Sequence, residues 1–266
     1  MIIEEITVTA FQQHTRIVGC EKTRSAICID PGDDSTTIVE AIDKHDFDLQ
    51  AIACTHAHMD HVGVGRPVNG DSIYNGADDD ASGTISVVEA AEAFSQLQPR
   101  PKRSIIFLTV SGEEKGLWGS AYFADHPSVP IADIVADLNT DMVGRNWKDT
   151  IVVIGKEHSD LGATLNRVGA AHPELGMQPI DDIWPQESFY TRSDHYNFAR
   201  KGVPILFFFN GTHPDYHRPS DSVDKIDAEK ESRIVKLVFY LGLDVANAAE
   251  RPKWNPDSYS RIVTAN

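Results

Sequence analysis

The chain has 266 residues, of which 41% are hydrophobic and 24% charged, so it can bury a sizeable core and is neither collagen-like nor disordered throughout. Its 40 acidic and 24 basic residues give a formal net charge of -16, which argues against nucleic acid and anionic membranes as partners. No apolar run approaches the ~20 residues of a membrane span, and the first residues lack the pattern of a secretory signal. We therefore expect a chain that is cytoplasmic as expressed. Its oligomeric state stays open.

The first third of the chain predicts a β-rich βαβ segment. A helix is expected from Ser35 or Thr36 to His45. Strands are expected around it, at Ile3–Thr9, Arg16–Gly19, Ala26–Ile29 and Leu49–Cys54. The cysteines all lie here, and their odd number does not indicate a disulfide framework. We expect them to be small buried side chains: Cys20, Cys28 and Cys54.

From residue 81 onward, strands alternate with helices. The predicted helices are Ala81–Leu97, Gly119–Ala124, Asp160–Ala171 and Ala228–Ala249. A further helix is expected to be capped by Asp194 and to run through Phe198. The predicted strands are Ser104–Val110, Ile134–Leu138, Ile151–Ile154 and Val203–Phe209. This order predicts a three-layer α/β/α sandwich with a mixed, mostly parallel sheet. We expect a single α/β domain over residues 1–266, with a loosely held polar tail at 251–266.

Five acidic or histidine-rich clusters fall in loops, most of them directly after predicted strands. They are HAHMDH at 56–61, GADDDASG at 76–83, GEE at 112–114, TDM at 140–142 and HPDYHRPSD at 213–221. In open α/β sheets, functional residues gather at the carboxyl ends of the strands. Imidazole and carboxylate groups bind zinc, and two metal ions that share a carboxylate and a water suit hydrolysis. Of the neighbours Glu113 and Glu114, one can bind metal while the other acts as general base.

These clusters, with their flanking residues, resemble the di-zinc aminopeptidase family over about residues 57–250. The stretches that carry the resemblance are HMDHVGVGRPVNGDSIYNGADDDASG, PKRSIIFLTVSGEEKGLWGS, DLNTDMVGR, SDHYNFARKGVP and GTHPDYHRPSDSVDKID. The resemblance implies a zinc exopeptidase fold and two zinc ions, for which cobalt or manganese are possible substitutes. It implies five metal ligands, namely His58, Asp79, Glu114, Asp141 and His217.

The same resemblance implies further roles. Asp79 would bridge both ions, with a cis peptide bond to Asp80, and Glu113 would be the general base. Asp60 would orient His58. Tyr216 would hydrogen-bond the tetrahedral oxyanion.

Residues 1–62 instead resemble the start of a metallo-β-lactamase-fold hydrolase of the glyoxalase II type. The resemblance rests on IDPG at 29–32 and THAHMDH at 55–61. In that family one metal would be held by His56 and His58, and the other by Asp60 and His61. The chain would then be a fusion, natural or engineered, of the two types at HAHMDH.

The favoured hypothesis is a zinc-dependent exopeptidase, in particular an aminopeptidase, that acts on peptides with a free N-terminus. We expect the substrate side chain to be held by the 180–216 region, where Ile183, Trp184, Phe189 and Tyr190 cluster. His213 has either a substrate contact or a turn role. The alternatives are a metallo-β-lactamase or glyoxalase II-type hydrolase, an inactive fusion that only binds metal, and a binding protein on this fold. Side-chain specificity, the native metal and the choice between aminopeptidase and carboxypeptidase stay open.

Overall fold

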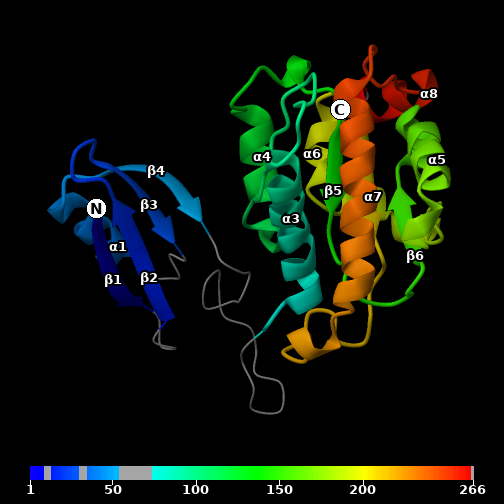
Figure 1. Cartoon of the computed structure of the whole chain (residues 1–266). Helices are drawn as coiled ribbons and strands as arrows, with labels where there is room; N and C mark the ends of the chain where they lie inside the picture. The colour runs from blue at the N-terminus through cyan, green and yellow to red at the C-terminus, as the bar shows by residue number, and fades with distance from the viewer. Residues whose placement is uncertain (9–12, 30–34, 54–73, 265–266) are drawn as a thin grey trace. The chain divides into compact units, whose positions relative to one another are not determined.

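A computed structural model describes residues 1–8, 13–29, 35–53 and 74–264 (Figure 1). We predicted one domain over 1–266. The chain instead divides into two compact units, each of which has its own four-stranded sheet. The first unit comprises Met1–Gly76 with Asp215–Val223, and the second comprises Ala77–Pro214 with Asp224–Asn266.

The first unit contains the predicted β-rich βαβ segment. Its sheet has the order β1-β2-β3-β4. Strands β1 to β3 are antiparallel neighbours, whereas β4 pairs parallel to β3. A parallel pair needs a crossover connection, and helix α1 supplies it. The elements are β1 (Ile2–Val8), β2 (Gln13–Gly19), β3 (Ser25–Ile29), α1 (Ser35–Lys44) and β4 (Asp48–Ala53).

The core of the first unit lies on one face of this sheet. Along β3, Ala26 and Cys28 are buried, whereas Ile27 between them is 37% exposed. That alternation is typical of a sheet covered on one side only. Cys28 is buried as predicted. The prediction for Cys20 is wrong, because Cys20 lies in the turn after β2 and is exposed. Cys54 lies outside the described residues.

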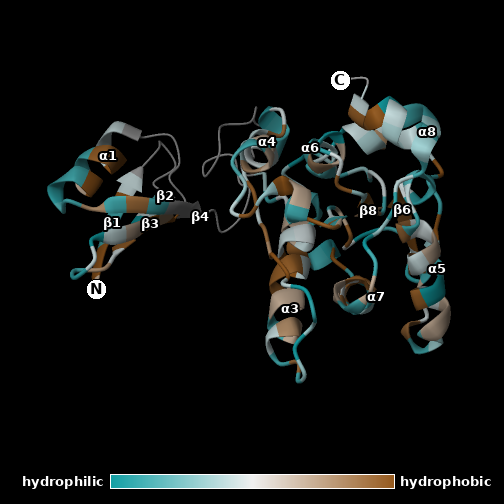
Figure 2. Ribbon diagram, turned by 90° about the horizontal axis from the view of Figure 1, so that it is seen from above, coloured by the Kyte–Doolittle hydropathy of each residue, from teal (hydrophilic) through white to brown (hydrophobic). Residues whose placement is uncertain are grey.

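The second unit has a mixed sheet in the order β5-β8-β6-β7. Strand β8 is parallel to β5, β7 is parallel to β6, and β6 and β8 are antiparallel. Helices cover both faces, with α4 and α6 on one side and α3, α5 and α7 on the other (Figure 2). The strands are β5 (Asp137–Thr140), β6 (Thr150–Ile154), β7 (Gln178–Ile180) and β8 (Ile205–Phe209). The helices are α3 (Gly83–Ser95), α4 (Trp118–Asp125), α5 (Leu161–Ala171), α6 (His195–Arg200) and α7 (Ala228–Asn247).

The central strands of the second unit are buried on both faces. On β8, Leu206 and Phe208 pack in the core that α5 and α7 form with the sheet. Phe207 points to the opposite face, where its ring stacks on His195 of α6 with centroids 4.3 Å apart. A strand that is apolar at every position is typical of a sheet with helices on both sides, as the sequence predicted.

Two predictions about strands in this unit are wrong. Ser104–Val110 forms no strand, since no backbone ladder involves it among the residues that the structure describes. Ile106 and Phe107 are 43% and 39% exposed there, so an apolar run alone did not create a paired strand. The short strand β7 was missed, because Pro179 at its centre is unusual in a strand and is tolerated at a sheet edge.

The predicted loose tail at 251–266 is also held in place, at least through residue 264. Trp254 donates its indole N–H to the Gly202 carbonyl at 2.9 Å and pairs with Ser159 in a β-bridge. Asn255 then caps a short helix, α8 (Pro256–Tyr259).

Within the described ranges, none of the helices combines the length and the apolar character that crossing a membrane requires.

Candidate metal centre

The turn that precedes α3, Ala77–Ser82, carries three consecutive aspartates. Asp79 and Asp80 leave the helical conformation, with φ/ψ of -111/88° and -132/46°, and the peptide bond between them is cis, as predicted. Gly83 follows where there is no room for a side chain. A Cβ there would lie 2.2 Å from the Thr140 carbonyl oxygen and 2.3 Å from Asp80 Oδ1. Glycine at this position lets the acidic turn approach the end of β5.

Asp80 joins the acidic turn to the loop after β5. Its Oδ1 accepts hydrogen bonds from the backbone N–H groups of Gly83, at 3.0 Å, and of Met142, at 3.2 Å. Thr140 adds a third link, since its hydroxyl donates to the Gly83 carbonyl at 3.1 Å. These bonds bring the aspartates of the turn close to Asp141.

The carboxylates in this region repel one another electrostatically. Burial raises the pKa of Asp80 well above its usual range, and the neighbouring charges of Asp141 and Asp79 raise it further. The pKa of Asp141 is likewise raised, first by burial, then by Asp79, with a smaller effect from Glu113. Carboxylates that suppress one another's ionisation are stabilised as anions by a cation placed between them. The cluster therefore suits a metal ion.

Asp141 provides the most direct test of that fit. Its Oδ2 accepts a hydrogen bond from the Ser193 hydroxyl at 2.8 Å, and Ser193 in turn accepts one from the Asn139 amide at 3.3 Å. Its Oδ1 is buried and has no hydrogen-bond partner among the described residues. A buried carboxylate oxygen without a partner requires an explanation, and ligation of an ion supplies one.

Two of the predicted ligands in the second unit, Asp79 and Glu114, each offer a carboxylate oxygen, and these two atoms lie within 4.8 Å of each other. The predicted ligand His217 belongs to the first unit, so its role stays a prediction. A set of carboxylates and an imidazole suits zinc. The ring of Tyr216 stacks on that of His217 with centroids 3.7 Å apart. Two other predicted residues, His58 and Asp60, lie outside the described residues, as do His56 and His61, so their roles stay predictions.

Glu113 and Glu114 lie in a single 3₁₀ turn, Glu113–Lys115. Gly112 and Gly116 flank it with φ of 74° and 108°, a left-handed conformation that glycine adopts without strain. Glu113 contributes to the electrostatic field at Asp141, whereas Glu114 has a carboxylate oxygen within 4.8 Å of one of Asp79. The neighbouring side chains therefore have different surroundings, which is compatible with the two roles predicted for them.

Sequence reasoning missed several polar residues that support this site. Asp194 occupies the N-cap position of α6, as predicted, but its side chain makes no capping bond and instead accepts a hydrogen bond from Ser120 of α4. Ser193, which holds Asp141, is the first residue of the stretch SDHYNFARKGVP that carries the family resemblance, but we predicted no contact with Asp141 for it. His213, for which we expected a substrate contact or a turn role, is buried against Asp78 with its side chain 1% exposed.

The residues predicted to line a substrate pocket do not all lie together. The indole of Trp184 contacts the rings of Phe189 and Phe209 with centroids 5.8 and 5.9 Å apart, and Ile183 is 47% exposed. Tyr190 is partly buried, and its ring contacts that of His195 instead.

The fold and the donor set define a mixed α/β protein with a candidate divalent-metal centre in the loops of its second unit. The chain belongs to peptidase family M28, whose model matches residues 39–242. The match begins inside the segment 1–62, so the resemblance of that segment to metallo-β-lactamase-fold hydrolases stays a prediction.

Several relatives of this chain are aminopeptidases. It is 28% identical over 207 residues to a probable leucine aminopeptidase of Arthroderma benhamiae, covering 75% of this chain and 55% of that protein. It is 26% identical to aminopeptidase YwaD of Bacillus subtilis, covering 74% and 43%. The LapA aminopeptidase of Legionella pneumophila has a similar structure, with a TM-score of 0.59, 26% identity, and coverage of 68% and 49%. The chain thus spans about half the length of the relatives it matches.

Proposed function

We propose that this protein is a zinc-dependent aminopeptidase that hydrolyses the first peptide bond of substrates with a free N-terminus. Membership of peptidase family M28 and the relatives named as aminopeptidases support this. The observation that carries the proposal is the convergence of carboxylates at Asp141, whose Oδ1 atom is buried and has no hydrogen-bond partner among the described residues.

The proposed ligands of two zinc ions are His58, Asp79, Glu114, Asp141 and His217. Bound zinc would polarise the scissile carbonyl group and lower the pKa of a water molecule. Cobalt and manganese are possible replacements, because imidazole and carboxylate donors bind them too. The short distance between carboxylate oxygens of Asp79 and Glu114 supports this assignment.

The remaining roles fall to residues beside these ligands. Glu113 accepts a proton from the attacking water and later delivers it to the leaving amine. Tyr216 donates a hydrogen bond to the oxyanion, for which its position beside His217 is suitable. Asp60 orients the imidazole of His58. Trp184 and the exposed Ile183 are candidates to contact the substrate side chain.

Hydrolysis of aminoacyl p-nitroanilides tests this function. We expect release of nitroaniline that a chelator abolishes and added zinc restores. Metal analysis of the active protein should give about two zinc ions per chain, as expected for a two-metal site. An N-acetylated anilide is the matched control, because it lacks the free amine. Turnover that is insensitive to chelation, or equally fast on the acetylated substrate, would contradict the proposal. Hydrolysis of S-lactoylglutathione instead would favour the glyoxalase II-type alternative.

A further inference from the structure

Asp78, which directly precedes Asp79, has a fully buried side chain that contacts three chain segments. Its Oδ1 accepts hydrogen bonds from the Gly144 backbone N–H at 2.7 Å and from the Ser82 hydroxyl at 3.1 Å. Its Oδ2 lies 3.2 Å from Nε2 of His213, whose side chain is 1% exposed. One carboxylate thus links the acidic turn, the loop after β5 and the loop after β8.

Other hydrogen bonds join the same segments. The Ser82 hydroxyl accepts the backbone N–H of Val143 at 3.0 Å. The loops after β5 and β8 are joined directly, since Asn210 donates its backbone N–H to the Met142 carbonyl at 3.2 Å and Asn146 donates its amide to the Asn210 carbonyl at 2.6 Å. The three segments therefore form one buried, hydrogen-bonded unit.

The position of Gly144 shows how tightly Asp78 is held. A Cβ on Gly144 would lie 2.9 Å from Asp78 Oδ1, a separation that real Cβ atoms essentially never show. The backbone N–H of Gly144 reaches the carboxylate only because no side chain intervenes. Asp78 thus has a hydrogen bond from Gly144 at one oxygen and a 3.2 Å ion-pair contact with His213 at the other.

We propose that Asp78 and His213 are positioning residues for the metal centre. Asp78 is adjacent to Asp79, and its partner Gly144 follows Asp141 by three residues, so the pair acts through two proposed ligands without touching metal or substrate itself. The inference rests on the proposed metal site and assigns to that site two residues that the ligand set does not include. Groups that orient metal ligands typically affect metal affinity or activity by about 10- to 100-fold.

The substitution His213→Gln tests the inference, with His158→Gln as its matched control. His158 is also largely buried, with 14% of its side chain exposed, and hydrogen-bonds Ser258. Both variants and the wild type are titrated with Co²⁺ while the visible absorption of the bound ion is recorded. For His213→Gln we expect binding weaker by about 10- to 100-fold and a shifted ligand-field spectrum. His158→Gln should bind Co²⁺ like the wild type.

Gly144→Ala provides a second variant should His213→Gln not fold. It removes no polar group but crowds both Asp78 and the side chain of Ile226, and we expect the same direction of change in affinity and spectrum. Wild-type affinity and spectrum in folded His213→Gln, or an equal loss in His158→Gln, would overturn the positioning role and leave the proposed function standing. A wild type that binds no Co²⁺ would instead refute the proposed metal site, and this inference with it.

Discussion

The two sheets of this protein differ in how many of their faces are covered by other parts of the chain. In the first unit, β3 alternates between buried Ala26 and Cys28 and exposed Ile27, so only one face is packed. In the second unit, all five residues of β8 are buried, and helices cover both faces. A sheet covered on both faces leaves its strand ends and loops as the places where polar chemistry can gather. Most of the candidate metal centre lies in such loops, at Asp79, Glu114 and Asp141.

In the second unit, the apolar core and a polar network lie on different faces of the sheet. Its apolar core lies between the sheet and α5 and α7. The helices on the other face bring a polar network, in which Ser193 bonds Asp141 and Ser120 bonds Asp194. The core supplies stability, and the network orients side chains. The largest functional effects should therefore arise from the loops, and the largest stability effects from the buried strands.

The strongest expected effect is on turnover, from Glu113→Gln. The substitution keeps the size of the side chain but removes its ability to accept a proton from water. We expect kcat to fall by about 10²- to 10⁴-fold while metal content stays that of the wild type. Aminoacyl anilide kinetics combined with metal analysis of the same samples measure both quantities.

Glu114→Gln is the matched control, one residue away. As a proposed ligand, Glu114 should affect metal content first, so this variant should lose bound zinc and regain activity when zinc is added in excess. If Glu113→Gln loses metal and Glu114→Gln does not, the roles of the two glutamates are reversed. Wild-type rates in Glu113→Gln would remove it from the mechanism.

Alanine substitutions at adjacent positions sharpen the comparison of the sheets. On β8, both Phe207→Ala and Phe208→Ala should cost about 3–5 kcal/mol, because each leaves a cavity in a packed face. In the first unit, Ile17→Ala at a fully buried position should cost about 2–5 kcal/mol. Ile27→Ala, at an exposed position, should cost about 0.5 kcal/mol or less.

Amide hydrogen exchange measures these effects locally, in each unit by itself. The amides of β8 should lose protection in both phenylalanine variants, and those of β3 in Ile17→Ala only. Equal losses in Ile17→Ala and Ile27→Ala would mean that both faces of the first sheet are covered. The contrast between the two sheets would then be wrong.

Helices and strands whose hydrophobic pattern matches the burial of their side chains could be predicted from the sequence. The βαβ order of the first unit, the apolar strand β8 and the long helix α7 were all predicted, because a period of two or 3.6 residues reports directly on burial. The strand at Ser104–Val110 was wrong because a strand exists only where a second backbone pairs with it. The division into two units was missed for a similar reason, since composition does not reveal which strands share a sheet.

For the candidate site, residue type carried more information than position. Runs of aspartate, glutamate and histidine in loops predicted the region that contains Asp79, Glu114 and Asp141, although only Asp141 follows a strand. The contacts of the supporting residues could not be predicted. Ser193 and His213 act through a single contact each, with Asp141 and Asp78, and such contacts depend on three-dimensional geometry.

A smaller effect is expected from Asp137, at the start of β5, on the pH dependence of stability. Burial, aided by the nearby Asp194, raises the pKa of Asp137 to about 7, and its Oδ2 has no hydrogen-bond partner among the described residues. Since the folded pKa exceeds the unfolded value of 3.8, stability is lost as pH rises from about 4 to about 7. Asp137→Asn removes that penalty without changing the size of the side chain.

Asp137→Asn should therefore raise the free energy of unfolding at pH 8 by a few kcal/mol and by clearly less at pH 5, since each pKa unit is worth about 1.4 kcal/mol. Urea denaturation at the two pH values measures the difference. Burial also raises the pKa of Glu231 to about 7, so this carboxyl group titrates over the same pH range. The variant Glu231→Gln therefore serves as the comparison. An identical gain at pH 5 and pH 8 for Asp137→Asn would show that its carboxyl is ionised in the folded protein at both.

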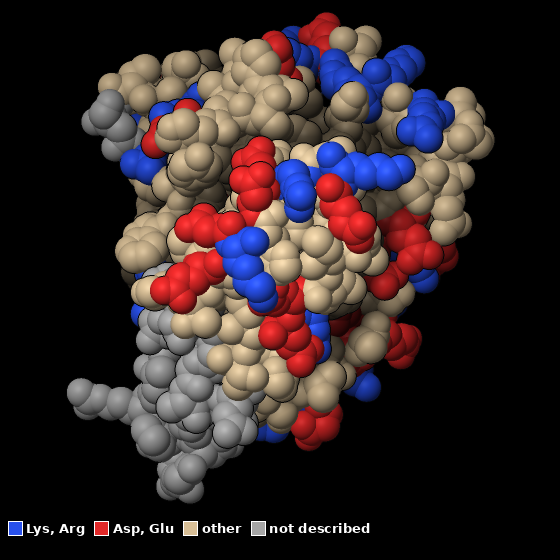
Figure 3. Space-filling model, turned by 90° about the vertical axis from the view of Figure 1, so that its left-hand side faces the viewer, with Lys and Arg blue, Asp and Glu red and all other residues tan. Residues whose placement is uncertain are grey.

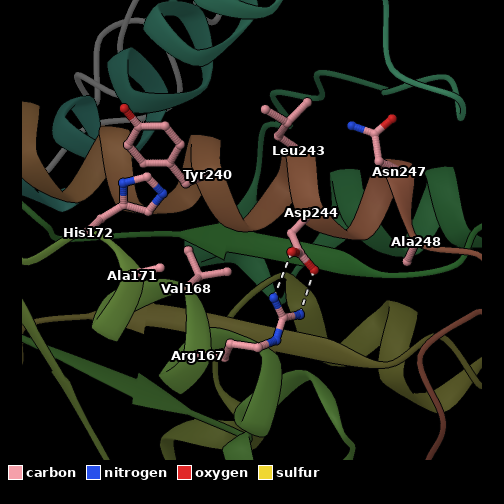
Figure 4. A pocket seen from close by; sticks show the side chains of 9 residues that line it. All are labelled: Arg167, Val168, Ala171, His172, Tyr240, Leu243, Asp244, Asn247 and Ala248. Carbon is pink, nitrogen blue, oxygen red and sulfur yellow. Dashed lines mark hydrogen bonds and ion pairs between the residues drawn. The ribbon is translucent and has the colours of Figure 1, made fainter.

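The smallest effects on stability should come from surface ion pairs. Each unit has such pairs, and they are exposed to water in both. Acidic and basic side chains are intermixed on the face drawn in Figure 3. In the first unit, Arg16 lies across from Glu5 in the adjacent strand, at 2.7 Å. In the second, Arg167 of α5 holds Asp244 of α7 through two hydrogen bonds of 2.8 and 2.9 Å (Figure 4). Water screens both pairs, so each should contribute little to the free energy of unfolding.

Double-mutant cycles measure the two couplings, with Arg16→Met and Glu5→Gln in one and Arg167→Met and Asp244→Asn in the other. We expect the larger coupling for Arg167 and Asp244, because the planar guanidinium binds the carboxylate in a bidentate manner. Hydrogen bonding to Arg167 lowers the pKa of Asp244, so this coupling should be present at neutral pH and be lost as pH falls through that lowered pKa. A larger coupling for Arg16 and Glu5 would show that position opposite a partner strand matters more than bidentate geometry.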